Sequence, residues 1–239
     1  MRNYPLDKDY PSLSYIVTNW PKTKPILRKF VMSNHKKPDL LKLCTNCLKD
    51  LNVHNYHNLK NALFKISQIC SKNVNSNTYH DQHHFKAVII ISCLLAKLSN
   101  LKTFDLILLV IIALAHDINH QGRRIIKKPF YQEIKSASDL EKIIFRKILN
   151  HKKWQRIFRI IKSTYFPIKP EAVDDYLEKI ILDADVIGSL MFGMDSGIEF
   201  ARRLKHEIRF AEDSEKLFGG FLKFLSEKSL YLDSSRDLC

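Results

Sequence analysis

Apolar residues recur every three or four positions along almost the whole chain, and the strict alternation typical of a β-strand is absent. This spacing predicts helices over residues 38–51, 56–71, 78–98, 103–117, 133–150, 152–164, 170–191, 194–211 and 213–227. Glycine, which weakens helices, occurs only 6 times in 239 residues. We therefore expect an all-α fold, a compact multi-helix domain of about nine helices.

The two ends of the chain depart from this pattern. Residues 1–36 contain four of the 8 prolines, and we expect them to form an N-terminal arm that packs on the domain. Residues 37–232 are long enough to bury one core and are expected to form a single domain. Residues 233–239 are predicted to be a frayed tail.

No segment has the pattern of a membrane span. The longest apolar run, Leu106 to Ala115, is much shorter than the roughly 20 residues that cross a bilayer. The N-terminus carries Asp7 and Asp9 and lacks the apolar stretch of a secretory signal. We expect a cytoplasmic protein without a membrane span.

The chain is basic, with 39 Lys and Arg against 25 Asp and Glu and a formal net charge of +14. Such a surface favours anionic partners. The basic residues are spread along the chain rather than interleaved with aromatic residues. A small anionic nucleotide is therefore the expected partner, nucleic acid is the weaker alternative, and the oligomeric state is left open.

The five cysteines are an odd number and are widely spaced, which favours reduced thiols. Cys44 and Cys47, followed by His54 and His57, have a spacing that could bind zinc. The two cysteines also fit the apolar face of the predicted helix 38–51. Helical core is the favoured interpretation, and zinc binding by these four residues is left open.

The densest group of candidate metal ligands lies between residues 77 and 122. It comprises His80, His83, His84, His116, Asp117 and His120. Thr78 can cap a helix that starts there, which would give His80 and His84 a common helical face. The next apolar helix ends at His116 and Asp117, and two such apolar helices are expected to pack together and bring these ligands near His84. Histidine and aspartate are preferred ligands in zinc, iron, manganese or magnesium sites.

Three motifs carry a resemblance to a known family. Residues 79–84 read Tyr-His-Asp-Gln-His-His, and residues 116–122 read His-Asp-Ile-Asn-His-Gln-Gly. A later aspartate follows alanine, and Asp185 fits that position better than Asp183. The three motifs resemble the signatures of the HD superfamily of metal-dependent phosphohydrolases, and within it those of the class I 3′,5′-cyclic-nucleotide phosphodiesterases.

This resemblance implies an HD-type domain with two divalent metal ions, of zinc, manganese, magnesium or iron. It implies that Asp117 bridges the two ions and that the ligands of the first are His84, His116, Asp117 and Asp185. His80 would be the general acid that protonates the leaving oxygen, and His120 would orient water or substrate.

Two more residues are candidates for contacts near the metals. Glu133 lies roughly where the family has a glutamate on the helix that follows the second motif. Arg123, together with Arg124, directly follows that motif and could bind a phosphate in a bidentate manner.

These assignments predict a phosphodiesterase that hydrolyses a 3′,5′-cyclic nucleotide through a metal-bridging hydroxide, with a histidine as general acid. The chain differs from the family at Asp81, where the family has asparagine. It also has no glutamine after Gln155, so the family's purine-binding glutamine has no counterpart. The alternatives are a nucleotidase or other phosphoester hydrolase on the same site, a di-iron oxygenase with His151 as the spare ligand, and a non-catalytic nucleotide-binding module.

Overall fold

The computed structural model describes residues 4–33, 39–73, 77–122, 128–144, 149–165, 172–209, 212–227 and 230–239. These ranges contain helices and no strand, apart from one isolated bridge between Asp7 and Tyr10. The helices are α1 (Leu13–Thr18), α2 (Lys24–Met32), α3 (Leu40–Asp50), α4 (His57–Asn73), α5 (Gln82–Lys97), α6 (Thr103–Ala115), α7 (Tyr131–Ile143), α8 (His151–Ser163), α9 (Tyr176–Ile187), α10 (Met194–Ile208), α11 (Ser214–Glu227) and α12 (Asp233–Leu238). The predicted all-α class is confirmed, and the described residues form twelve helices where about nine were expected.

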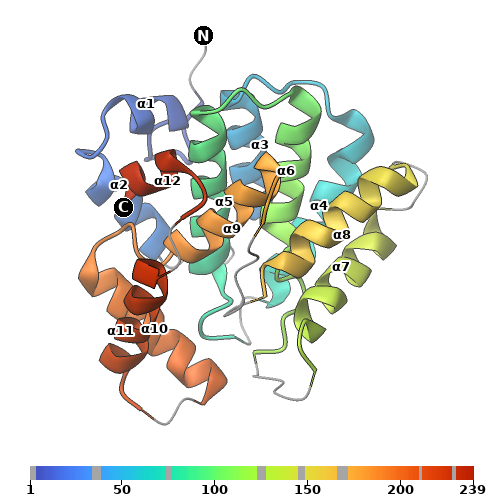
Figure 1. Cartoon of the computed structure of the whole chain (residues 1–239). Helices are drawn as coiled ribbons and strands as arrows, with labels where there is room; N and C mark the ends of the chain where they lie inside the picture. Colours follow the sequence, from blue (N-terminus) through green and yellow to red (C-terminus); the bar gives the residue numbers. More distant parts are fainter. Residues whose placement is uncertain are drawn as a thin grey trace.

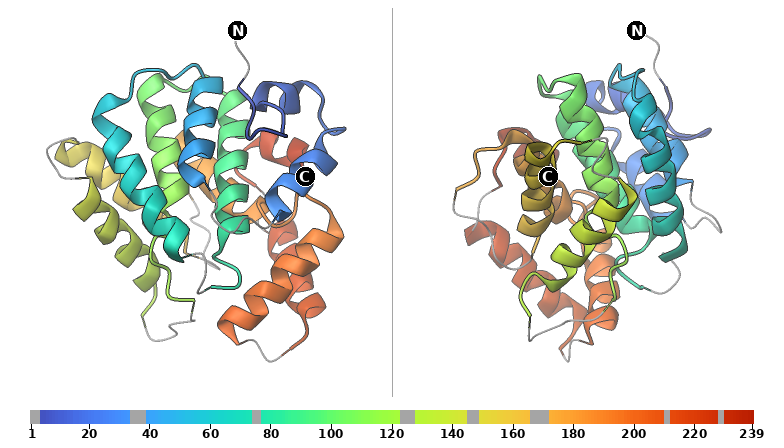
Figure 2. Two further views of the ribbon diagram at one scale, coloured as in Figure 1. Left: turned by 180° about the vertical axis from the view of Figure 1, so that it is seen from behind. Right: turned by 90° about the vertical axis from the view of Figure 1, so that its right-hand side faces the viewer.

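Helices α5 and α6 form the centre of the fold and pack side by side (Figure 1). Every residue of α5 from Gln82 to Ala96, and of α6 from Leu106 to Ala115, is buried. Helix α9 crosses one side of this pair, and α3 and α4 cover the opposite side (Figure 2). Both central helices are apolar around almost their whole circumference because other helices surround them.

The outer helices form two pairs. Helices α7 and α8 pack on each other and contact α4, α6 and α9. Helices α10 and α11 pack mainly on each other and form a hairpin at the other end of the molecule (Figure 1). This hairpin reaches the centre of the fold through a few specific side chains, which are described with the site below.

Helix α5 begins four residues later than the sequence predicted. Asp81 is its N-cap, and the carboxylate accepts hydrogen bonds from the backbone N–H groups of His83 at 2.8 Å and His84 at 3.4 Å. His80 therefore lies in a turn before the helix, and the expectation that it shares a helical face with His84 is wrong. Thr78 is not the cap, because its hydroxyl donates to a backbone carbonyl of α10 instead.

The C-terminal residues are packed rather than frayed. Residues 233–238 form α12, and the Trp20 indole donates to the carbonyl oxygen of Asp237 at 3.1 Å. Lys24 likewise donates to the carbonyl oxygen of Cys239 at 2.7 Å. The predicted tail is thus a short helix held by the N-terminal arm, whose described part forms α1 and α2 on α5.

The cysteines of α3 belong to the hydrophobic core. Cys44 and Cys47 are fully buried, and burial raises the pKa of the Cys44 thiol well above its ordinary value. His54 is exposed, and the side chain of His57 lies outside the described residues. Core packing therefore accounts for both cysteines.

None of the helices in the described ranges is long and apolar enough to cross a membrane.

Arg156 on α8 links the starts of two neighbouring helices. Its guanidinium donates to Asp175, the N-cap of α9, at 2.6 and 2.8 Å, and to Asp105 in the first turn of α6 at 2.5 Å. Burial alone would raise the pKa of Asp175, but the charge and hydrogen bonds of Arg156 outweigh it and lower that pKa. The pair stabilises the folded state whenever Asp175 is ionised.

Arg156→Met should lower the free energy of unfolding by about 1–3 kcal/mol at neutral pH, because it leaves Asp175 and Asp105 without this partner. The stabilisation by Arg156 is complete above the ordinary aspartate pKa of about 3.9 and is lost as pH falls through the lowered pKa of Asp175. Urea unfolding at neutral and acidic pH measures both effects. Lys152→Met, an exposed change on the same helix, is the control. A pH-independent loss, or the same loss in both variants, would contradict this role.

Candidate active site

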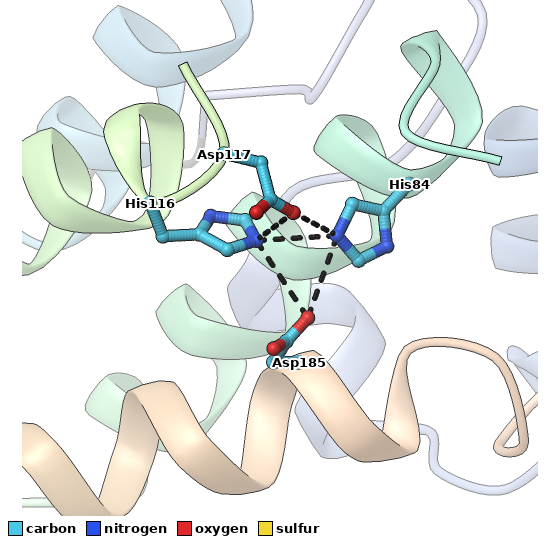
Figure 3. A group of neighbouring side chains, drawn as sticks. All are labelled: His84, His116, Asp117 and Asp185. Carbon is cyan, nitrogen blue, oxygen red and sulfur yellow. Dashed lines mark hydrogen bonds and ion pairs between the residues drawn. The ribbon is translucent and has the colours of Figure 1, made fainter. Parts of the chain in front are cut away.

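Four candidate metal ligands meet where α5, α6 and α9 come together (Figure 3). His84 lies in the first turn of α5, His116 caps the end of α6, Asp117 follows it, and Asp185 lies in the last turn of α9. His84 Nε2 lies 3.1 Å from His116 Nε2, 3.1 Å from Asp117 Oδ2 and 3.4 Å from Asp185 Oδ1. His116 Nε2 lies 3.0 Å from Asp117 Oδ2 and 3.6 Å from Asp185 Oδ1. The structure thus brings together the four residues that the sequence suggested as ligands.

A divalent ion fits the arrangement of these atoms. His116 Nδ1 lies 2.9 Å from the carbonyl oxygen of Ala113, so the ring donates there, and its neutral form presents the Nε2 lone pair to the cluster. The oxygens of Asp117 and Asp185 that face it are also acceptors. Acceptors this close repel one another unless positive charge lies between them. Two imidazole nitrogens and two carboxylate oxygens are a donor set that zinc, iron and manganese accept.

The electrostatics of the cluster also favour positive charge. Burial alone would raise the pKa of Asp117, but His116 and His80 outweigh it, and the pKa lies well below its ordinary value. Burial alone would lower the pKa of His116, but Asp117 and Asp185 raise it well above its ordinary value. The two ligand histidines are closed to solvent, whereas the side chains of Asp117 and Asp185 are 13% and 22% exposed. A ligand would therefore reach the cluster from the carboxylate side.

A second group of titratable residues, His80, His120 and Glu207, lies beside this cluster. The rings of His80 and His120 stack, with centroids 3.6 Å apart and planes inclined by 27°. His80 Nδ1 is hydrogen-bonded to Glu207 Oε1, and its Nε2 lies 3.6 Å from Asp117 Oδ2. His80 therefore stands between the carboxylate of Glu207 and the metal-ligand cluster.

Hydrogen bonds already use much of this second group's capacity. Glu207 Oε2 accepts from the backbone N–H groups of Tyr79 at 2.7 Å and His80 at 3.1 Å. His120 Nδ1 accepts from the N–H of Gly122 at 3.1 Å. Burial alone would raise the pKa of Glu207, but His80 and these backbone donors lower it to about 2. His80, His120 and Glu207 lie close enough together to hold an ion. Their hydrogen bonds, however, fit a different role, in which the Glu207 carboxylate orients the ring of His80.

Glu207 was not singled out from the sequence. It lies on α10, 127 residues after its partner His80. The available signal is its spacing of four from Arg203 and of eight from Glu199, which puts three charged residues on one helical face. That spacing does not reveal which part of the chain the face contacts.

The remaining predicted residues have different surroundings. Burial raises the pKa of Glu133 to about 7, with a further contribution from Asp117, and its buried Oε2 has no hydrogen-bond partner among the described residues. Asp183 is not part of the cluster, and its carboxylate accepts from the backbone N–H groups of Tyr231 and Leu232 at 3.0 and 2.9 Å. Arg123 lies outside the described residues.

Comparisons with known proteins bear on the fold. No protein-family model matches the sequence, and no curated protein matches it either. The fold is similar to that of a phosphodiesterase domain. A solved structure of the phosphodiesterase domain of the RhoPDE fusion protein from the choanoflagellate Salpingoeca rosetta is similar, with a TM-score of 0.54 over 89% of this chain and 84% of that chain, at 16% identity. The resemblance carried by the histidine motifs is thus confirmed at the level of the fold.

His84→Ala and Asp117→Ala should each weaken Mn²⁺ binding by at least about 100-fold, since each removes a ligand atom from the centre of the cluster. Isothermal titration with Mn²⁺ measures this loss without any substrate. His54→Ala removes an exposed histidine that is not part of the cluster and should leave Mn²⁺ binding unchanged. Unaltered Mn²⁺ affinity in both ligand variants would show that the cluster is not the metal site.

Proposed function

We propose that this chain is a metal-dependent phosphodiesterase that hydrolyses a 3′,5′-cyclic nucleotide. The observation that carries the proposal is the geometry of His80, which lies 3.6 Å from Asp117 through Nε2 and is bonded to Glu207 through Nδ1. A cluster of metal ligands alone would suit many reactions. A histidine oriented beside that cluster, in a fold similar to a phosphodiesterase domain, suits hydrolysis of a phosphoester.

His84, His116, Asp117 and Asp185 would hold the first divalent ion, and Asp117 would bridge to a second. When bound, the ions supply a water molecule of lowered pKa and positive charge that offsets the charge of the phosphate. Because Asp117 and Asp185 are the ligands with exposed side chains, the phosphate would approach from their side.

His80 would act as the general acid. As the oxygen of water bonds to phosphorus, the bond between phosphorus and the 3′ oxygen breaks, and that oxygen takes the proton of His80 Nε2. The proton lost by water passes to solvent, His80 is protonated again, and the product is a nucleoside 5′-monophosphate. Glu207 accepts the Nδ1–H and so keeps Nε2 turned toward the cluster. Such an acid contributes roughly 10² to 10⁴ in rate.

His120 would donate a hydrogen bond to water or a phosphate oxygen rather than transfer a proton. Burial and the neighbouring His80 lower its pKa to about 3, so the ring is neutral. Its Nδ1 accepts from the N–H of Gly122, which leaves the proton on Nε2 as a donor. Glu133 would contribute a carboxyl group near the ligands, and Arg123 remains a candidate for binding the phosphate.

A nucleotidase or another phosphoester hydrolase on the same site is the second candidate. A pocket next to Tyr79 is lined by apolar side chains of α10 and α11, among them Phe200, Phe218 and Phe221. Its polar lining consists of the hydroxyls of Tyr79 and Ser189, which bond to each other at 3.1 Å. Among the described residues no amide side chain lines this pocket, and the sequence has no glutamine after Gln155 that could bind the edge of a purine, so a substrate with a different organic group is favoured.

The direct test is hydrolysis of 3′,5′-cyclic nucleotides, linear dinucleotides and nucleoside monophosphates with added Mn²⁺ or Mg²⁺. We expect metal-dependent turnover of a cyclic nucleotide that is lost in Asp117→Ala. Turnover of monophosphates alone would support the nucleotidase. Metal binding without turnover of any substrate would contradict both proposals and favour a non-catalytic nucleotide-binding module.

His80→Ala should lower kcat for a cyclic nucleotide by roughly 10² to 10⁴, because the 3′ alkoxide leaves poorly without a proton. The same variant should retain most activity on bis(p-nitrophenyl) phosphate, whose nitrophenolate leaves without help, and should still bind Mn²⁺. Steady-state kinetics with both substrates measure the difference. Full activity of His80→Ala on the cyclic nucleotide would rule out the general-acid role.

A further inference from the structure

Glu207 is not the sole residue of α10 that contacts the turn around His80 in the described structure. Glu199, Arg203 and Glu207 are spaced four residues apart and share one face of α10. Glu207 binds the turn directly at Tyr79 and His80. Arg203, one helical turn earlier, contacts the residues on either side of them.

Arg203 makes four polar contacts. Its carbonyl oxygen accepts the hydroxyl of Thr78 at 2.8 Å, and its Nη1 donates to Asp81 Oδ2 at 3.0 Å. The same Nη1 lies 2.6 Å from His83 Nδ1, and Nε donates to Glu199 Oε1 at 2.8 Å. The two ends of the turn, Thr78 and Asp81, are therefore both attached to one residue of α10.

The pair between Arg203 and Asp81 is mostly buried. The side chain of Asp81 is 12% exposed and that of Arg203 is 16% exposed. A carboxylate in such surroundings needs a cationic partner. The other oxygen of Asp81 caps α5 by accepting from His83, so this carboxylate joins the start of α5 to α10.

Helix α10 also makes an apolar contact with this turn. Helices α10 and α11 pack mainly on each other, and the ring of Tyr79 lies edge-on to Phe200 with centroids 6.0 Å apart. The polar bonds of Arg203 and Glu207, together with this ring contact, attach the α10–α11 hairpin to the turn.

We propose that Arg203 is a positioning residue for the reaction. By pairing with Asp81 and accepting the Thr78 hydroxyl, it holds the turn 78–81 so that His80 Nε2 faces the metal-ligand cluster. This inference rests on the proposed function, because the position of His80 affects the rate only if His80 donates a proton in the reaction. Arg203 itself touches neither the ligands nor the leaving group.

The test compares Arg203→Gln with Arg202→Gln. Arg202 is exposed and binds Glu199 at 2.8 and 2.9 Å but makes no described contact with the turn. Arg203→Gln should lower kcat for 3′,5′-cyclic AMP by roughly 10- to 100-fold, as expected for a misplaced catalytic group. It should change kcat for bis(p-nitrophenyl) phosphate by less than about threefold, since that leaving group needs no acid. Arg202→Gln should change neither substrate's kcat.

A second variant and a second readout separate positioning from folding. Arg203→Lys keeps a cation for Asp81 and should recover part of the cyclic AMP activity, whereas the Mn²⁺ affinity of both Arg203 variants should stay within about threefold of wild type. If Arg203→Gln does not fold, Arg203→Lys is used for the test instead. We then expect a several-fold loss of kcat for cyclic AMP and no loss of kcat for bis(p-nitrophenyl) phosphate.

Equal losses on both substrates, a parallel loss of Mn²⁺ affinity, or an Arg203→Gln protein that behaves like Arg202→Gln would overturn the inference. A wild-type protein that hydrolyses neither substrate would instead contradict the proposed function.

Discussion

The burial of α5 on every side is the constraint on which the site depends. A helix with no solvent-facing stripe must be surrounded by others, and here α6 and α9 supply two of its neighbours. The start of α5, the end of α6 and the last turn of α9 consequently meet at one point. The ligands His84, His116, Asp117 and Asp185 sit at those helix ends, so the packing of the core also sets the distances within the candidate metal centre.

The candidate acid is held by a different part of the chain. Three core helices supply the four ligands, whereas α10 of the C-terminal hairpin supplies Glu207 and Arg203, which bind the turn around His80. The candidate metal ligands and the candidate acid are thus held by different parts of the fold, which come together at Asp117. This separation has a functional consequence: changes on α10 should affect catalysis that needs an acid more than they affect the metal ions.

The fold class could be predicted from sequence because apolar spacing is a local signal, whereas the full set of four ligands, Asp185 above all, came from the resemblance of the three motifs to a known family. The all-α class follows from apolar spacing, and the meeting of His84 with His116 and Asp117 follows from two apolar helices that end in these residues. The start of α5 was predicted too early because threonine and aspartate are both good N-caps, and Thr78 comes first in the chain. In the structure the Thr78 hydroxyl binds α10 instead, and Asp81 is the N-cap. Glu207 and the packed C-terminal helix depend on partners far away in the chain, which no local spacing could identify.

The central claim is that the four-ligand cluster and His80 together cleave the bond between phosphorus and oxygen of a phosphodiester. Turnover of a cyclic nucleotide with Mn²⁺ in isotopically labelled water tests it most directly, with the position of the heavy oxygen read by mass spectrometry of the product. The account predicts a 5′-monophosphate with the heavy oxygen on phosphorus. Heavy oxygen on the ribose, or no metal-dependent product, would contradict it.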